Sequence, residues 1–357
     1  MPIYNFAAGP AVLPAPVLQQ VQAELLDYQG SHMSILEISH RSSLFTELYA
    51  QAKERLLNLL ELSDDYEVLF LQGGATLQFT MVPLNLAVKH HRIAIAQTGH
   101  WAARAVEEAR RLPDLTVDVV TDAGPDYTTI PALPALPKDQ YDYLHLTTNN
   151  TIYGTAYHQL PATSVPLVGD LSSNFLGQQY PFDQFDLIYA GAQKNLAPAG
   201  VTIVVVKKSR LAQVPAGLPS MLDYAALAKK DSALNTPPVF QIYVAALVLK
   251  WLQDQGGVAA MAAENTRKAQ VLYDFLAQSR LFNNPVAPAA RSLTNIPFVT
   301  GDAALDAAFL AEATAAGLLN LKGHRSVGGM RASLYNAMPY EGVVALRDFM
   351  ATFEKHH

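Results

Sequence analysis

A lysine in a loop of small residues is the strongest chemical signal in this sequence. Lys194 lies in the stretch YAGAQKNLAPAG (189–200), between two apolar runs that are predicted to be strands. Few charges lie near it in sequence. Partial burial would therefore lower the pKa of its ammonium and let the amine form a Schiff base with an aldehyde. The alternative is a solvated surface lysine, which is the commoner outcome for a lysine in a loop.

A carboxylate upstream of this lysine suggests a partner group. Asp170 ends the apolar run PLVGD, 24 positions before Lys194. A carboxylate at the end of a buried strand is costly unless a cation pairs with it. A protonated pyridine nitrogen would be such a cation. The alternative is a helix N-cap, because LSSN follows directly.

Two weaker signals precede the aspartate. The stretch QGGAT (72–76) follows a predicted strand and precedes an apolar stretch predicted to be a helix, and a helix N-terminus after glycines favours phosphate. It is neither GxGxxG nor a Walker loop, and any strand–turn–helix junction needs glycine. Trp101 follows another predicted strand and could stack on a flat ring, although a lone tryptophan is usually a core residue. Phosphate loop, aromatic, aspartate and lysine in this order match the needs of pyridoxal phosphate.

The elements that must position these residues alternate along the chain. Short apolar runs bounded by polar, glycine or proline residues are typical of strands covered on both faces, and helical stretches between several of them favour an α/β fold. The predicted strands are Tyr66–Leu71, Arg92–Thr98, Thr116–Thr121, Tyr141–Thr147, Pro166–Asp170, Asp186–Ala190 and Val201–Val206.

The rest of the chain suggests an arm and a smaller domain. Periodicity predicts helices over 17–28, 43–60, 239–252, 258–279 and 340–353, and strands near 292–299, 318–322 and 330–335. The proline-rich segment 123–140 is predicted to be a surface connection. We expect an N-terminal arm (1–15), a large α/β domain (16–257) and a small C-terminal α+β domain (258–357).

Composition narrows the class of protein. The 357 residues include 25 Lys and Arg against 31 Asp and Glu, and a net charge of −6 argues against a nucleic-acid partner. Only 16% of residues are charged and 50% are hydrophobic, so we expect a partner subunit to cover part of the surface. The absence of cysteine excludes disulfides, cysteine-ligated metals and cysteine nucleophiles, and no metal site is expected. With no predicted signal peptide or membrane span, we expect a cytoplasmic protein without a membrane partner.

Motifs along nearly the whole chain resemble those of the phosphoserine aminotransferases, fold-type I pyridoxal-phosphate enzymes of the class V aminotransferase group. The resemblance implies a large domain with a mostly parallel seven-stranded sheet, a small C-terminal α+β domain and a homodimer with shared active sites. The block around Lys194 and the last motif below are the most specific. The matching stretches are NFAAGPA (5–11), SILEISHRS (34–42), QGGAT (72–76), NNTIYGT (149–155), GDLSSNF (169–175), YAGAQKNLAPAG (189–200), LNTPPVF (234–240) and KGHRSVGGMRASLYNAMP (322–339).

The same resemblance implies catalytic and cofactor-binding roles. Lys194 forms the Schiff base with the cofactor and moves the proton between Cα and C4′. Asp170 holds the pyridinium proton, which makes the ring an electron sink. Trp101 stacks on the ring, and Thr151 reaches its phenolic oxygen.

A further set of residues is implied to bind the cofactor's 5′-phosphate. Ala75 and Thr76 offer backbone amides, Thr76 also offers a hydroxyl, and Gln193 joins them. Asn235 and Thr236 reach the same phosphate from the neighbouring subunit, which makes the dimer part of the active site.

The substrate of such an enzyme carries two separated anionic groups, and the resemblance implies the cations that bind them. Arg331 takes the α-carboxylate, for which a planar guanidinium is suited. His40, Arg41, His324 and Arg325 take the phosphate of phosphoserine or the side-chain carboxylate of glutamate, with His40 and Arg41 supplied by the partner chain.

The function implied is 3-phosphoserine:2-oxoglutarate transamination in L-serine biosynthesis, by two ping-pong half-reactions. One alternative is a class V relative of the alanine–glyoxylate type, which the two histidine–arginine pairs disfavour because alanine and glyoxylate carry no second anion. Another is a non-catalytic protein that binds a phosphate ligand on the same fold. Such binding would not need Lys194 together with Asp170.

Overall fold

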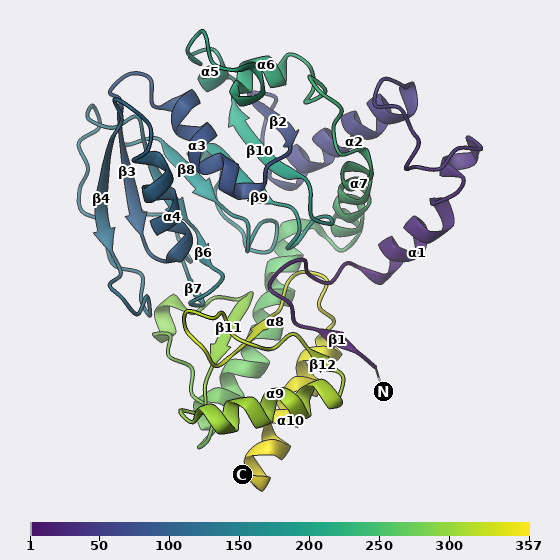
Figure 1. Ribbon diagram of the computed structural model, residues 1–357, viewed down its shortest axis with the longest axis vertical. Coiled ribbons are helices and arrows are strands. Elements are labelled where there is room, and N and C mark those ends of the chain that lie inside the picture. Colours follow the sequence, from purple (N-terminus) through teal and green to yellow (C-terminus); the bar gives the residue numbers. More distant parts are fainter. Residues whose placement is uncertain (1) are drawn as a thin grey trace.

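A seven-stranded sheet forms the centre of the computed structural model, which describes residues 2–357 (Figure 1). The strand order is β2-β10-β9-β8-β5-β3-β4, and β10 is antiparallel to both of its neighbours while the other pairs are parallel. Each of the seven strands lies within two residues of its predicted bounds. They are β2 (Tyr66–Leu71), β3 (Arg92–Gln97), β4 (Thr116–Asp122), β5 (Tyr143–Thr147), β8 (Leu167–Asp170), β9 (Phe185–Gly191) and β10 (Thr202–Lys207).

Helices cover both faces of this sheet, so alternate strand residues enter different apolar clusters. In β2, Val68 and Phe70 pack in one cluster with residues of α2 and α7, whereas Leu69 and Leu71 pack in another with residues of α3 and α4. This burial on both sides explains why the strands are continuous apolar runs. The helices around the sheet are α1 (Ala15–Glu24), α2 (Ser43–Leu59), α3 (Gly74–Leu86), α4 (His100–Ala109), α5 (Lys208–Leu211), α6 (Tyr224–Ala228) and α7 (Val239–Asp254).

The C-terminal part has its own apolar cluster, which includes Phe6 from the N-terminal arm. In Figure 1 the start of the chain, with β1, lies beside this part. Its helices are α8 (Gly257–Gln278), α9 (Ala303–Ala315) and α10 (Tyr340–His356). An antiparallel pair joins β11 (Asn295–Phe298) to β13 (Met330–Ser333), and a parallel pair joins β1 (Tyr4–Asn5) to β12 (Leu318–Leu319). The arm is thus bound to the C-terminal part, while the domain boundaries at 15/16 and 257/258 stay a prediction.

The remaining elements are short. A hairpin of β6 (Asn149–Asn150) and β7 (Thr155–Ala156) lies beyond β5. Single 3₁₀ turns are η1 (Tyr28–Gly30), η2 (Phe182–Gln184), η3 (Ser220–Leu222) and η4 (Pro288–Ala290).

Two helix predictions need correction. The helix expected over 17–28 begins at Ala15 and ends at Glu24, because Pro16 suits the first helical turn and the chain turns into η1 with Gln29 at a φ of 51°. No helix was predicted over 303–315, where α9 buries only Phe309 and Ala313 and so lacks a clear apolar stripe. Its start is fixed instead by Asp302, whose side chain accepts bonds from two backbone amides.

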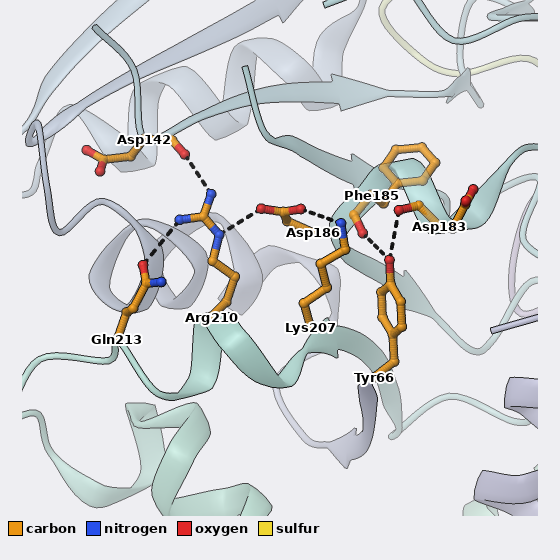
Figure 2. Close-up of polar contacts among 8 residues, drawn as sticks. All are labelled: Tyr66, Asp142, Asp183, Phe185, Asp186, Lys207, Arg210 and Gln213. Atoms are coloured by element: carbon orange, nitrogen blue, oxygen red, sulfur yellow. Dashed lines mark hydrogen bonds and ion pairs between the residues drawn. The ribbon is translucent and has the colours of Figure 1, made fainter. Parts of the chain in front are cut away.

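A polar network closes the amino edge of the sheet (Figure 2). Asp186, at the start of β9, accepts from Lys207 Nζ at 2.8 Å and Arg210 Nε at 2.7 Å. Beside it, the Tyr66 hydroxyl donates to the carbonyl of Phe185 at 2.9 Å. These bonds join β2, β9, β10 and α5 at this edge, and the carboxyl edge of the parallel strands is the opposite one.

Within residues 2–357, no helix has the length and apolar character needed to cross a membrane. The same residues contain no group of three or more histidine, aspartate or glutamate side chains placed to hold a metal ion.

Candidate active site

Asp170 lies at the carboxyl edge of the sheet, where β8 ends. Its side chain is only 5% exposed, and its Oδ1 accepts from the backbone amide of Ser172 at 2.9 Å. The alternative of a helix N-cap does not hold, because residues 171–177 form turns and loop and not a helix. The carboxyl group is therefore buried and fixed by a local turn.

Lys194 lies in the loop between β9 and β10, next to this edge. Its Nζ donates to the hydroxyl of Thr151 at 2.9 Å. The sequence predicted a lowered pKa for this amine. Its pKa is lowered from 10.5 to about 8, chiefly by burial, which Asp170 opposes and Arg331 supports. An amine with this pKa is partly neutral near pH 7–8, as a nucleophile must be.

Arg331 lies on the other side of Thr151. This residue of β13 donates from Nη1 to the Thr151 carbonyl at 3.1 Å. Its Nε is buried and meets no acceptor in residues 2–357, and burial lowers the pKa of the guanidinium. Lys194 and Arg331 thus both donate to Thr151 of the β6–β7 hairpin. The guanidinium of Arg331 keeps one donor, Nε, without an acceptor among residues 2–357. A carboxylate ligand would supply the acceptor that Nε lacks.

Trp101, His100 and His324 form a cluster of rings near Arg331. The indole Nε1 of Trp101 is buried and, among the described residues, has no acceptor. The His100 ring lies 5.1 Å from the Trp101 ring and 6.0 Å from the ring of His324. The pKa of His324 is lowered first by burial and then by three basic neighbours, Arg331, His100 and Arg325. Such a gathering of cationic groups suits an anionic ligand.

His100 is a member of this group that the sequence did not reveal. It opens α4 directly before Trp101, so the motif TGHWAAR contained it. The signal for its role is its contact with His324, which lies far away in sequence.

The predicted phosphate loop opens α3. Gly73 and Gly74 have φ angles of 91° and 68°, which favour glycine, and no side chain caps the helix. The first amides of a helix lack intrahelical acceptors, so those of Ala75 and Thr76 suit an anion. Gln193 is half-buried next to Lys194, and its carbonyl accepts from the amide of Ala11 at 2.9 Å.

Asn235 and Thr236 lie beside this loop within one chain. Asn235 Nδ2 donates to Gln72 Oε1 at 3.1 Å, and Gln72 Nε2 donates to the carbonyl of Thr236 at 3.2 Å. Both residues are exposed. That they bind the cofactor phosphate of a neighbouring subunit stays a prediction.

His40 and Arg41 lie apart from the other predicted cations. They precede α2, and His40 lines a cavity of about 410 Å³ together with Lys53 and Asp231. Among residues 2–357, no hydrogen bond or ion pair connects this pair to the site around Lys194 within one chain. The structure thus brings the other predicted residues near one edge of the sheet and leaves these two outside it.

Comparison with known proteins identifies the family. The family model "Aminotransferase class-V" matches residues 3–346. The chain is 73% identical to a phosphoserine aminotransferase of Limosilactobacillus fermentum over 99% of both chains. It is 58% identical to the one of Lactiplantibacillus plantarum over the full length of both. The chain belongs to the phosphoserine aminotransferase family. The predicted family and the class of enzyme, a pyridoxal-phosphate-dependent transaminase, are confirmed.

Solved structures of phosphoserine aminotransferases confirm the predicted fold. The enzyme of Bacillus circulans subsp. alkalophilus has a TM-score of 0.96 at 42% identity, with 99% of each chain covered. A PLP-bound phosphoserine aminotransferase of Trichomonas vaginalis has a TM-score of 0.93 at 37% identity, covering 98% of this chain and all of the other. An alanine–glyoxylate aminotransferase of Nostoc sp., with a TM-score of 0.76 at 15% identity, shares the fold alone.

Proposed function

We propose that this chain transfers the amino group of glutamate to 3-phosphonooxypyruvate, which gives O-phosphoserine and 2-oxoglutarate in L-serine biosynthesis. The observation that carries the proposal is the arrangement around Thr151. Its hydroxyl accepts from the half-buried amine of Lys194, and its carbonyl accepts from Arg331. A nucleophilic amine and a carboxylate-binding group are the two parts that amino-acid transamination needs.

The groups left without partners fit pyridoxal phosphate and its substrate. Trp101 Nε1 and Arg331 Nε are buried donors for which residues 2–357 offer no acceptor, and the uncapped amino end of α3 suits a phosphate. When bound, pyridoxal phosphate supplies a ring that withdraws electrons and makes the Cα proton of an amino acid acidic. The residues proposed to hold it are Asp170 at the ring nitrogen, Trp101 at the ring face, Thr151 at the phenolic oxygen, and Ala75, Thr76 and Gln193 at the phosphate.

Lys194 performs the proton transfer in this proposal. Because the pKa of its amine is about 8, a useful fraction is neutral at physiological pH, as an amine that bonds to an aldehyde must be. With the cofactor bound, Lys194 Nζ would be the base that takes the proton from the substrate Cα. The hydroxyl of Thr151, 2.9 Å from this Nζ, would hold the amine in place.

The cations divide the recognition of a substrate with two anionic groups. Arg331 binds the α-carboxylate that every amino-acid substrate carries. His324 and Arg325 bind the phosphate of phosphoserine or the distal carboxylate of glutamate, and His40 and Arg41 join them from the neighbouring subunit.

This sharing requires a homodimer, which we also propose. The segment with α1, η1 and the following loop extends away from the body of the molecule (Figure 1). It exposes large apolar side chains, with Leu26 82%, Leu36 63% and Leu18 49% exposed, in the same segment as His40 and Arg41. Apolar side chains gathered on one projecting segment are typical of a contact with another protein surface.

We propose further that the chain acts in the cytoplasm and divides into an arm (1–15), a large domain (16–257) and a small domain (258–357).

A steady-state assay tests the proposed function. The purified protein, loaded with pyridoxal phosphate, should form glutamate from phosphoserine and 2-oxoglutarate, and a Lys194→Ala variant prepared in parallel should not. Wild-type protein that binds the cofactor but forms no glutamate from this pair would contradict the proposal.

A further inference from the structure

A second buried lysine lies away from the site described above. Lys268 belongs to α8, which runs between the large layered part and the C-terminal helices (Figure 1), and its side chain is 0% exposed. Its Nζ donates to three backbone carbonyls, those of Tyr335 at 2.9 Å, Met338 at 3.2 Å and Asn336 at 3.3 Å. Burial lowers the pKa of this amine to about 8, which marks the cost of keeping a charge here.

The chemistry of this contact explains why a lysine occupies the position. Three carbonyl oxygens converge on one buried point, and an ammonium is the side-chain group that offers three N–H donors from a single atom. Without it, the carbonyls of the turn at 335–338 would lose a buried donor. Lys268 therefore fixes the shape of this turn.

The turn at 335–338 is itself bonded to the loop that carries Lys194. The backbone amide of Asn336 donates to Oδ1 of Asn195 at 3.0 Å, directly beside Lys194. The side chain of Asn336 donates to the carbonyl of Leu176 at 3.2 Å, in the loop that follows Asp170. Both asparagines are buried, at 7% and 6% exposed. A short chain of hydrogen bonds thus runs from Lys268 through Asn336 to two loops, the one that carries Lys194 and the one that follows Asp170.

We infer that Lys268 is a positioning residue for Lys194, acting through the turn at 335–338 and the bond from Asn336 to Asn195. The inference rests on the proposed function, because it assigns Lys194 as the reacting amine. Lys268 itself touches neither substrate nor cofactor. Its effect is to hold the amine of Lys194 where proton transfer at Cα is efficient.

The test is a double-mutant cycle on the cofactor-loaded enzyme. Lys268→Met keeps the length of the side chain and removes its donors, and Asn195→Ala cuts the bond to the turn. The matched control is Lys250→Met, which removes an exposed lysine of α7 that pairs with Asp254. The readouts are kcat, KM for phosphoserine, and the pH midpoint of the visible absorption band that the cofactor gives when bound at Lys194.

Each single substitution should lower kcat by roughly ten- to a hundredfold, since small misplacements of a reacting group cost this much, with KM nearly unchanged. Each should also displace the pH midpoint of the band, and the double variant should be no worse than the poorer single variant. Lys250→Met should match wild type.

Lower thermal stability of Lys268→Met with unchanged kcat and band midpoint would overturn the inference, as would multiplicative effects on kcat in the double variant. If Lys268→Met does not fold, Asn195→Ala decides, because wild-type kcat and midpoint in that variant would overturn it equally. Inactive wild-type enzyme would instead contradict the proposed function itself.

Discussion

The pKa of Lys194 in the cofactor-free protein gives a quantitative prediction. An ordinary lysine has a pKa of 10.5, whereas burial brings that of Lys194 to about 8. At pH 7 about one Lys194 amine in ten should therefore be neutral, against about one in three thousand for an ordinary lysine, a gain of roughly three-hundredfold in reactive amine. The reactivity of Lys194 should rise about tenfold per pH unit below pH 8 and level off above it.

Two substitutions should move this midpoint in opposite directions. Asp170 raises the pKa of Lys194 and Arg331 lowers it. Asp170→Asn removes a negative charge with little change of shape, so the midpoint should fall below that of wild type. Arg331→Met removes a positive charge, so the midpoint should rise.

The assay is acylation of the cofactor-free protein with a small amine-reactive reagent over a range of pH, followed by mass spectrometry of each lysine. Exposed Lys250 serves as the internal control, and its labelling should be the same in all three proteins. A Lys194 midpoint near 10.5, or a shift in the same direction for both substitutions, would refute the electrostatic account of this amine.

Other predictions concern the roles of single residues. Lys194→Ala should abolish transamination and leave no cofactor adduct that borohydride can fix, and an adduct on another lysine would contradict the assignment. Arg331→Ala should weaken every amino-acid substrate, whereas Arg325→Ala should weaken phosphoserine and glutamate about tenfold or more and spare alanine, because a charge-assisted bond contributes roughly 1.5–3 kcal/mol. Equal losses for phosphoserine and alanine in Arg325→Ala would argue against its role. Mixing Lys194→Ala chains with Asn235→Ala/Thr236→Ala chains should restore activity to some sites of the mixed dimer, and mixed dimers without activity would place the loop in its own subunit's site.

The sequence predicted the central sheet well because its strands are buried on both faces and therefore appear as uninterrupted apolar runs. It failed at α9, which has a good N-cap in Asp302 but buries only Phe309 and Ala313, so no helical stripe marks it. The end of the first helix was also missed, since no glycine or proline lies between Glu24, where the helix ends, and Gln29, which has a left-handed φ of 51°.

In the site, sequence reasoning named Lys194 and Asp170 from their own motifs, and the structure places both at the carboxyl edge of the sheet. Their catalytic roles stay a prediction. Sequence reasoning missed His100, whose significance lies in a contact with His324 that only the fold creates. Lys268 was missed for the same reason, because its three acceptors belong to a turn that is distant in sequence.

The most direct test of the central claim is a set of single half-reactions. The cofactor-loaded protein is titrated separately with phosphoserine, glutamate, alanine and aspartate, and the loss of the visible absorption band measures conversion of the cofactor to its amine form. Phosphoserine and glutamate should discharge the band at far lower concentration than alanine, because alanine carries no second anion for His324 and Arg325 to bind. Discharge by alanine at concentrations as low as those of phosphoserine would contradict the assigned substrate class.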